Sequence, residues 1–359
     1  MSKIKMTSKE RVLATFAYEK ADRVPINYSG NPGITKRLMD HYGLTDYEEL
    51  LKILGVDFKG VGASYKGGKL HEDIPDRGVI VDNWGIHRRW IEHETGGYWD
   101  YCDFPLKDAD EEKIAQWKMP SPDDFDYSGI SERCKILKEY AINGSAGFGD
   151  LINGNGMLRT MEQTLVDLIT DDPAGLLLAD RRFSIQLEMT ERILEKANGG
   201  VDFLWLGEDL GTQIAPLISM DVFRRHIRPR YQKFCDLAKA YSIPAMIHTC
   251  GSSSWAYEDF IEMGIKVVDT LQPEAYNMSP KYLKETYGGR LAFHGCISTA
   301  GPLASGTVQD AIDDVKNTLE IMMPGGGYCL APTHAIQDNS PTENVVAMYE
   351  TAHKFGVYY

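Results

Sequence analysis

A strand–loop–helix unit that recurs along most of the chain constrains the fold more than any other feature of this sequence. Short apolar runs alternate with amphipathic stretches of helical periodicity, which is typical of a parallel sheet covered by helices. The number of units and the chain length favour a closed barrel of the TIM (β/α)8 type over an open sheet. Strands are predicted over residues 141–150, 201–211, 243–251, 266–273, 290–299 and 325–337.

The N-terminal part departs from this repeat. A helix is predicted over residues 8–18, with Thr7 or Ser8 as its cap, and a short strand over residues 22–26. Residues 60–105, with scattered Gly, Trp and Tyr, indicate an irregular or β-rich segment. Because no linker or charge block divides the chain, we predict a single α/β domain over residues 1–359, a barrel with an N-terminal helical and β extension.

Composition excludes several classes of partner. A formal net charge of −14 argues against binding to nucleic acid and to anionic membrane surfaces. No run of 18 apolar residues and no secretory signal are found, so we expect a cytoplasmic protein that does not enter a membrane. Its six cysteines are then expected to bind metal or to pack in the core, since cytoplasmic thiols stay reduced.

Polar and metal-capable side chains collect where the predicted strands end. In TIM barrels the active site lies at the C-terminal ends of the strands. The side chains at these ends are Glu208, Asp209, His248, Cys250, Gln272, His294, Cys296, His334 and Gln337. Their convergence predicts an active site at this end of the barrel.

The segment His248-Thr249-Cys250 indicates half of a metal site. Residues two apart on a strand face the same side, so His248 and Cys250 are expected to point the same way. Imidazole nitrogen and thiolate sulfur are preferred ligands of zinc. The alternative is a packed core pair, but the position at a strand end, before Gly251 and three serines, favours the metal.

A catalytic zinc needs a third protein ligand and an open position. Cys296 repeats the His-x-Cys spacing on a later strand, and His334 follows the last strand, where a loop side chain can reach the barrel mouth. Cys329 lies on the opposite strand face from His334 and is expected in the core. His294 is expected to be a packed or hydrogen-bonded histidine.

Carboxylates and amides supply the remaining catalytic and substrate-binding predictions. Glu208 and Asp209 are adjacent and point opposite ways on a strand, so at most one faces the site, as an acid, a substrate acceptor or a partner of a metal-bound histidine. The alternative is a capping carboxylate for the next helix. Substrate contacts are predicted for Asn153, Gln213 and Gln272 at strand ends, and for Trp84 in a segment that covers the mouth.

Four segments resemble the uroporphyrinogen decarboxylase superfamily, whose fold is a TIM barrel. They are KERVLATFAYEKADRVPIN (9–27), LISMDVFRRHIRPRYQKF (217–234), IHTCG (247–251) and GGGYCLAPTHAIQDNSPTENVVAMYE (325–350). True decarboxylases carry an arginine-rich motif, MRQAGRY, that binds an acidic tetrapyrrole. The corresponding residues 26–43 lack it, so the resemblance does not imply tetrapyrrole decarboxylation.

A second branch of the superfamily comprises cobalamin-dependent methyltransferases. Their zinc motif is His-x-Cys followed by a distant Cys, and His248 and Cys250 match its first half. At the place of the distant Cys this chain has His334-Ala335-Ile336, so His334, or Cys296 from the neighbouring strand, would complete the ligand set.

This resemblance implies a zinc-dependent methyltransferase. It would move a methyl group between methylcobalamin on a corrinoid partner protein and a small acceptor, either a thiol or tetrahydrofolate. Zinc would stabilise a substrate thiolate, whereas a pterin would be oriented by Asp209, Asn153 and Gln213. Homodimers are common among such relatives.

Two other functions stay open. One is a lyase that acts on a small carboxylated substrate, with Asp209 as acid and His334 as base. The other is a non-catalytic partner that binds metal or corrinoid.

Overall fold

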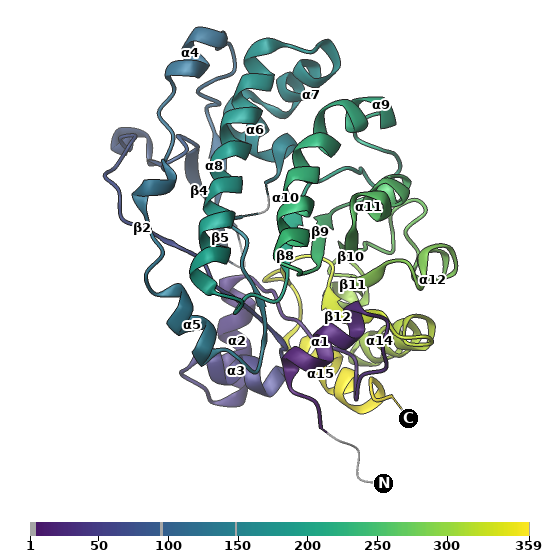
Figure 1. The fold of residues 1–359 in the computed structure, drawn as a ribbon. Coiled ribbons are helices and arrows are strands. Elements are labelled where there is room, and N and C mark those ends of the chain that lie inside the picture. The colour runs from purple at the N-terminus through teal and green to yellow at the C-terminus, as the bar shows by residue number, and fades with distance from the viewer. Residues whose placement is uncertain (1–4, 94–95, 148, 359) are drawn as a thin grey trace.

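Five parallel strands form the main sheet of the computed structural model, which describes residues 5–93, 96–147 and 149–358. The strands are β8 (Leu204–Gly207), β9 (Ala245–Thr249), β10 (Ile265–Thr270), β11 (Ala292–Ile297) and β12 (Tyr328–Pro332). Strands that follow one another along the chain are neighbours in the sheet. Parallel neighbours require crossover connections, and helices provide them (Figure 1). The predicted α/β class with a parallel sheet is confirmed.

Two further parallel strands extend this order beyond β8. They are β1 (Phe58–Gly60) and β7 (Ala141–Asn143), which pair with each other. A single parallel bridge joins Asn143 of β7 to Phe203, the residue before β8. The parallel arrangement therefore continues from the main sheet into the N-terminal half of the chain.

The strand predicted over residues 22–26 is reduced to isolated bridges. Ile26 bridges Leu330 of β12 in parallel, and the carbonyl of Ile26 accepts a hydrogen bond from the amide of Asp57 (2.9 Å). Pro25 accepts from the amide of Leu330 but has no amide hydrogen to donate, so a regular ladder cannot form at this point. The segment lies between β12 and the start of β1.

Helices connect the strands and cover the outer side of the sheet (Figure 1). They are α1 (Ser8–Phe16), α2 (Pro32–Tyr42), α3 (Tyr47–Leu54), α4 (Glu111–Gln116), α5 (Ile130–Ile136), α6 (Leu151–Arg159), α7 (Met161–Thr170), α8 (Pro173–Ala197), α9 (Met220–Val222), α10 (Arg228–Ala240), α11 (Tyr257–Met263), α12 (Pro280–Tyr287), α13 (Pro302–Ser305), α14 (Val308–Met322) and α15 (Thr342–Phe355). None of the helices in the described ranges is both long and apolar enough to cross a membrane.

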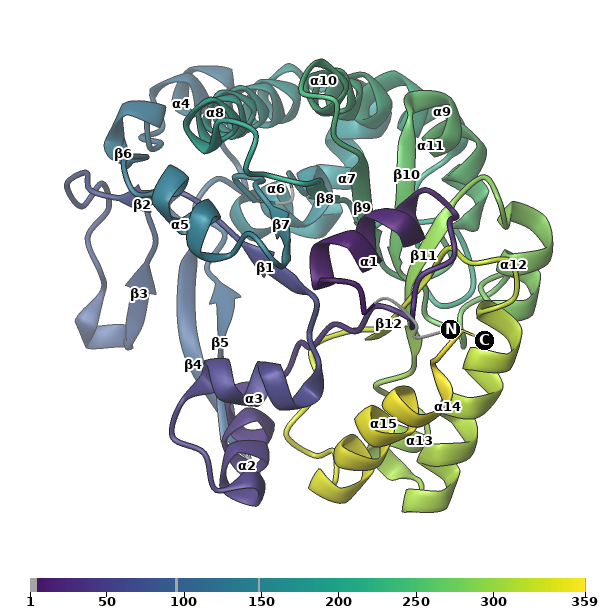
Figure 2. The same cartoon turned by 60° about the horizontal axis from the view of Figure 1, so that its bottom comes forward.

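Helix α1 lies against the N-terminal ends of the parallel strands (Figure 2). It begins as predicted, because the side chain of Thr7 caps the amide of Glu10 and the Glu10 carboxylate accepts from the amide of Thr7. Its Val12 and Phe16 pack in one buried cluster with residues at or near the starts of seven parallel strands: Phe58, Ala141, Phe203, Met246, Val267, Ala292 and Cys329. This end of the sheet is therefore closed by apolar packing, and Cys329 is a core residue as expected.

An antiparallel extension follows β1, in agreement with the β-rich segment predicted over residues 60–105. It consists of a short pair and a three-stranded sheet, both outside the parallel sheet. Its strands are β2 (Ser64–Tyr65) paired with β6 (Phe125–Asp126), and β3 (Val79–Val81), β4 (His87–His93) and β5 (Gly96–Cys102) in that order.

The fully buried carboxylate of Asp57 ties the N-terminal elements together. It binds Nη1 of Arg11 on α1 (2.6 Å) and Nη1 of Arg23 (2.7 Å), and it accepts from the amide of Ile26 (2.8 Å). A charge removed from water is tolerated only when it is paired and hydrogen-bonded in this way. Asp57 thus fixes α1 and the Ile26 segment to the start of β1.

Replacement of this carboxylate is expected to destabilise the protein strongly. Asp57→Ala removes the carboxylate shared by the buried Arg11, which keeps only its pair with Asp22, and the half-buried Arg23. It should lower the free energy of unfolding by about 3–5 kcal/mol. Denaturation with urea, followed by far-UV circular dichroism, measures this change. The control Asp40→Ala removes an exposed pair with Lys36 and should cost less than about 1 kcal/mol. Equal effects of the two substitutions would contradict the anchoring role.

Candidate functional site

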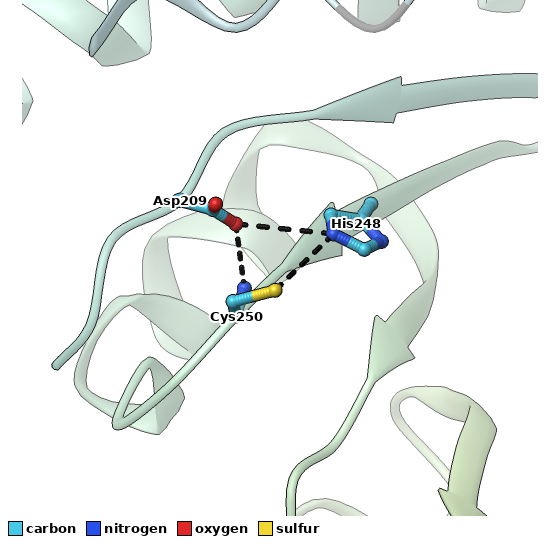
Figure 3. A group of neighbouring side chains, drawn as sticks. All are labelled: Asp209, His248 and Cys250. Atoms are coloured by element: carbon cyan, nitrogen blue, oxygen red, sulfur yellow. Dashed lines mark hydrogen bonds and ion pairs between the residues drawn. The ribbon is translucent and has the colours of Figure 1, made fainter. Parts of the chain in front are cut away.

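Three metal-capable side chains meet beyond the C-terminal ends of β8 and β9 (Figure 3). One ligand atom from each of Asp209, His248 and Cys250 lies within 4.8 Å of the other two. Nε2 of His248 is 3.4 Å from Sγ of Cys250 and 3.8 Å from Oδ1 of Asp209. His248 and Cys250 thus lie on the same side of the chain, as the period of a strand requires.

The turn after Cys250 holds this residue beside the loop that carries Asp209. Gly251 has a φ of +69°, and a Cβ at this position would lie 2.3 Å from the carbonyl oxygen of Gly211. Only glycine fits such a left-handed position with so close an approach of two backbones. The amide of Gly251 donates to Oε1 of Gln272 (2.7 Å), which connects the turn to the end of β10.

Hydrogen bonds fix both oxygens of the Asp209 carboxylate. Oδ1 accepts from the amide of Cys250 (2.9 Å), and Oδ2 accepts from Nδ2 of Asn153 (2.8 Å). The carboxylate is thereby held beside the sulfur and the imidazole. Asn153 therefore holds Asp209 in place. The sequence analysis had predicted that Asn153 contacts the substrate.

Asn153 lies in the first turn of α6, and the prediction that placed it at a strand end was wrong. The strand predicted over residues 141–150 is reduced to β7 and an isolated parallel bridge from Gly149 to Gly207; residue 148 lies outside the described residues. Asp150 accepts from the amide of Asn153 (3.2 Å) and caps the helix, which the apolar pattern concealed.

His248 is oriented by the neighbouring strand β10. Its Nδ1 lies 2.7 Å from Oδ2 of Asp269, the residue opposite it in the strand register, and 2.8 Å from Oγ1 of Thr270. A carboxylate can only accept, so Nδ1 carries the hydrogen and Nε2 faces Asp209 and Cys250. Histidine ligands of metals typically have such a carboxylate partner on their second nitrogen.

Asp269 is shared by two histidines. Its Oδ1 lies 2.5 Å from Nδ1 of His294 on β11, whose Nε2 is 3.1 Å from Nδ2 of Asn27. Burial alone would raise the pKa of Asp269, but the charges of His294 and His248 and their hydrogen bonds hold it well below the usual range. The carboxylate therefore stays ionised in the interior of the protein.

The same surroundings favour a positive charge at His248. Burial opposes this charge, but hydrogen bonds to Asp269 and Cys250 raise the pKa of His248 well above its ordinary value. Burial also raises the pKa of the Cys250 thiol, which the neighbouring imidazole opposes. The group offers nitrogen, sulfur and oxygen donors to zinc, which would bind with loss of the protons on Nε2 of His248 and Sγ of Cys250.

Glu208 points to the start of α6. Its carboxylate accepts from the amides of Leu151 (2.8 Å) and Ile152 (2.9 Å) and from the hydroxyl of Tyr231 (3.0 Å). Burial, and then the charge of Asp150, raise the pKa of Glu208 well above its usual range. Of the adjacent pair, the structure thus brings only Asp209 to the metal-capable group, and Glu208 holds a helix terminus.

Among the described residues, neither Gln213 nor Trp84 has a hydrogen bond or ring contact with Asp209, His248 or Cys250. Gln213 is exposed, and its backbone carbonyl accepts from the amide of Tyr276. The Trp84 ring lies 5.7 Å from the guanidinium carbon of Arg182, and its carbonyl accepts from Nε1 of Trp117. Gln272 contacts the group only through Gly251.

His334 and Cys296 lie outside the group of three. His334 is exposed and lines a cavity of about 290 Å³ whose walls also include His248, Asp269 and His294. Cys296 is buried in β11, and burial raises its thiol pKa strongly. Within the described ranges, only Asp209, His248 and Cys250 form a set of three or more metal-capable residues.

Sequence reasoning missed Asp269 as a member of the site and gave His294 no function. A signal was present, because Asp269 is a lone carboxylate in an apolar strand that neighbours the His248 strand. In a parallel sheet covered by helices, such a charge is placed only where a partner exists on an adjacent strand.

The sequence matches the family model of uroporphyrinogen decarboxylase (URO-D) over residues 151–355, more than half of the chain. No curated protein matches the chain. Among solved structures, a methyltransferase from Methanosarcina mazei superposes with a TM-score of 0.62 at 21% sequence identity, over 98% of this chain and 99% of that protein. At this identity the likeness establishes the fold alone.

Two other solved structures align with a smaller part of the chain. A 3-keto-D-glucoside 4-epimerase from E. coli has a TM-score of 0.36 at 14% identity, over 63% of this chain and 94% of its own. An IolI protein with a bound zinc atom has a TM-score of 0.34 at 14% identity, over 63% and 79%. These scores are too low to support an inference about the site.

Asp150 is expected to destabilise the metal-free protein as pH rises through the titration of its carboxyl. Burial, and then the charge of Asp209, raise the pKa of Asp150 to about 6, against about 3.9 in an unfolded chain. Between these values Asp150 binds more protons in the folded than in the unfolded chain, so its contribution to the free energy of unfolding falls as pH increases. Asp150→Asn keeps the helix cap and should flatten this fall.

Urea midpoints of both proteins at pH 4.5 and 6.5, measured with chelator, test this expectation. The control Asp46→Asn changes the N-cap of α3 and should follow the wild-type curve. An Asp150→Asn curve parallel to the wild type would show that Asp150 does not titrate in this range.

Proposed function

The chain belongs to the uroporphyrinogen decarboxylase family, and within this family we propose that it is a zinc-dependent methyltransferase. The observation that carries the proposal is the group of Asp209, His248 and Cys250, with Asp269 behind the histidine. A similar fold occurs in the methyltransferase from Methanosarcina mazei, so this architecture is compatible with methyl transfer.

Asp209, His248 and Cys250 are the proposed zinc ligands. Carboxylate, imidazole and thiolate are all common ligands of zinc, and three protein ligands leave a coordination position for a substrate. Asp209 takes the place for which the sequence suggested His334 or Cys296. Its carboxylate is already beside the other two donors, whereas His334 lies on the cavity wall and Cys296 is buried.

When bound, zinc would act as a Lewis acid and favour the thiolate form of a thiol substrate. The protein's own residues prepare the site. Asp269 and Thr270 orient His248, and Asn153 holds Asp209. The cavity lined by His248 and His334 gives a small substrate room beside these groups.

We propose that the methyl group passes between methylcobalamin on a corrinoid partner protein and a small acceptor, a thiol or tetrahydrofolate. Methylcobalamin would supply an electrophilic methyl group: the acceptor's sulfur or nitrogen would form the new bond to the methyl carbon, the cobalt–carbon bond would break, and its electron pair would remain on cobalt. The C-terminal ends of the strands, opposite α1, are the side on which such a partner would approach the group.

A barrel of the TIM type over a single domain is also proposed. Support comes from the parallel bridges that link β7 to the residue before β8 and Ile26 to β12. Further support comes from the single apolar cluster in which α1 meets the starts of seven strands. A closed arrangement would bring every strand end to the same mouth.

Zinc content separates the proposed ligand set from the one that the sequence suggested. Purified wild-type protein is expected to hold about one zinc ion per chain. His248→Ala, Cys250→Ser and Asp209→Ala should each lose most of this metal, because each removes one donor. His334→Ala and Cys296→Ala should keep it. Elemental analysis after dialysis provides the measurement.

Cys102→Ser serves as the matched control, since Cys102 is a half-buried free cysteine on β5. Its zinc content should equal that of the wild type. Unchanged zinc in both His248→Ala and Cys250→Ser would refute the metal site. Loss in His334→Ala with retention in Asp209→Ala would return the third position to His334.

Methyl transfer itself is tested by the demethylation of methylcobalamin, followed by its absorbance, with thiols and tetrahydrofolate as acceptors. His248→Ala should lower the rate by at least about 100-fold, the scale expected when a metal ligand is lost. Turnover that persists in this variant, or that is absent in the zinc-loaded wild type with every acceptor, would contradict the proposed reaction.

A further inference from the structure

The hairpin of β4 and β5 carries an exposed aromatic face. Direct cross-strand pairs place Trp90 opposite Trp99, Arg88 opposite Tyr101 and Ile80 of β3 opposite Arg88. Residues directly opposite one another in an antiparallel sheet lie on the same face. We call this set, Ile80, Arg88, Trp90, Trp99 and Tyr101, the aromatic face.

The aromatic rings of this face are ordered but accessible. Trp90 and Trp99 are 47% and 43% exposed, and their rings pack edge to face at 5.7 Å. A Cβ on Gly97 would lie 2.4 Å from the Trp90 ring, so the ring rests on this glycine. Large apolar side chains grouped on an accessible face usually mark a binding surface.

The base of the aromatic face adjoins the helix that supports the metal-capable group. Nη2 of Arg88 lies 3.8 Å from Sδ of Met157 on α6. Met157 follows Asn153 by four residues, so both side chains lie on the same side of α6. Asn153 binds Asp209, and the aromatic face therefore borders the same side of α6 as the proposed zinc ligands.

The start of β5 adjoins the loop that follows β12. A Cβ on Gly96 would lie 3.1 Å from Oδ2 of Asp338, whose Oδ1 accepts a hydrogen bond from the amide of Ile34 at the start of α2. Asp338 belongs to the loop after β12, the loop that carries His334. Figure 2 shows β4 and β5 extending toward α2. The hairpin thus spans from α6 to the loop that lines the cavity.

We propose that the aromatic face binds a flat, conjugated ring that bears a carboxylate, as the small-molecule substrate of this site. The inference rests on the proposed function, and it specifies the class of that substrate. Trp90, Trp99 and Tyr101 supply ring faces and edges for stacking. Arg88 has five N–H donors, more than its contacts with Met157 and Asp82 occupy, and is placed to pair with the carboxylate.

Two probes represent this class. Tetrahydrofolate joins a pterin ring to a glutamate tail, and 4-methoxybenzoate is a single ring with a carboxylate and a methyl group. Equilibrium dissociation constants are measured for both with zinc-loaded protein by isothermal titration calorimetry. Binding of at least one probe is expected, and the affinities distinguish a pterin from a single-ring ligand.

Trp99→Ala should weaken binding of that probe by about 10-fold, the scale of one lost stacking contact. Trp99→Phe keeps a ring and should lose less. Tyr98→Ala is the matched control, because Tyr98 is the adjacent residue, is 49% exposed and lies on the other face of β5. Its dissociation constant should stay within about twofold of the wild type.

A second measurement detects binding in the wild-type protein and uses variants only to assign the resonances. Wild-type protein labelled with 5-fluorotryptophan should show shifts of the Trp90 and Trp99 fluorine resonances when the probe is added, assigned through single Trp→Phe variants. Equal weakening by Trp99→Ala and Tyr98→Ala, unshifted Trp90 and Trp99 resonances, or no binding of either probe would overturn the inference.

These outcomes are separate from those of the proposed function. Absent binding of both probes, together with zinc-dependent methyl transfer to a thiol, would remove the aromatic-ligand inference and leave the proposed reaction intact. Ring binding that is lost in Trp99→Ala, in a protein without methyl transfer activity, would retain the binding surface and remove the reaction. Zinc content should be equal in all these variants.

Discussion

The geometry of the site depends on one buried carboxylate. Asp269 is 3% exposed, and a charge at this depth is stable only if hydrogen-bond donors surround it. Its two oxygens take one histidine from β9 and one from β11, so three adjacent strands share a single ionic contact. The orientation of His248 follows from this contact. Cys250 and Asp209, which are held by the turn at Gly251 and by Asn153, meet the nitrogen that this contact leaves facing them.

The sequence permitted a correct grouping of His248 with Cys250, because a strand has a strict period of two and both residues belong to one strand. The third member was harder to identify. Asp209 belongs to another strand, and its distance from Cys250 depends on the sheet register and on the turn at Gly251. His334 matched a family position, yet it follows a strand three places away from β9. Contacts between strands are set by register, which residue spacing does not encode.

The same distinction applies to the fold. Alternating apolar and amphipathic runs predicted the parallel sheet and its helices, since each run acts through local periodicity. Where two local signals competed, the prediction was wrong. The strand was predicted to continue to residue 150, but β7 ends at Asn143 and the side chain of Asp150 caps α6. Pro25 likewise interrupts a run that is otherwise typical of a strand.

The two residues that follow β8 have different functions. Glu208 satisfies the first amides of α6, and Asp209 lies among the metal-capable side chains. Insertion or deletion of one residue here would reverse the sides to which the two carboxylates point. A side chain of the wrong length would then face the start of α6, and another would face the metal-capable group. Evolution can therefore vary the chemistry at position 209 by substitution but not by a change in loop length. The architecture of α6 and the identity of the site are inherited together at this point of the chain.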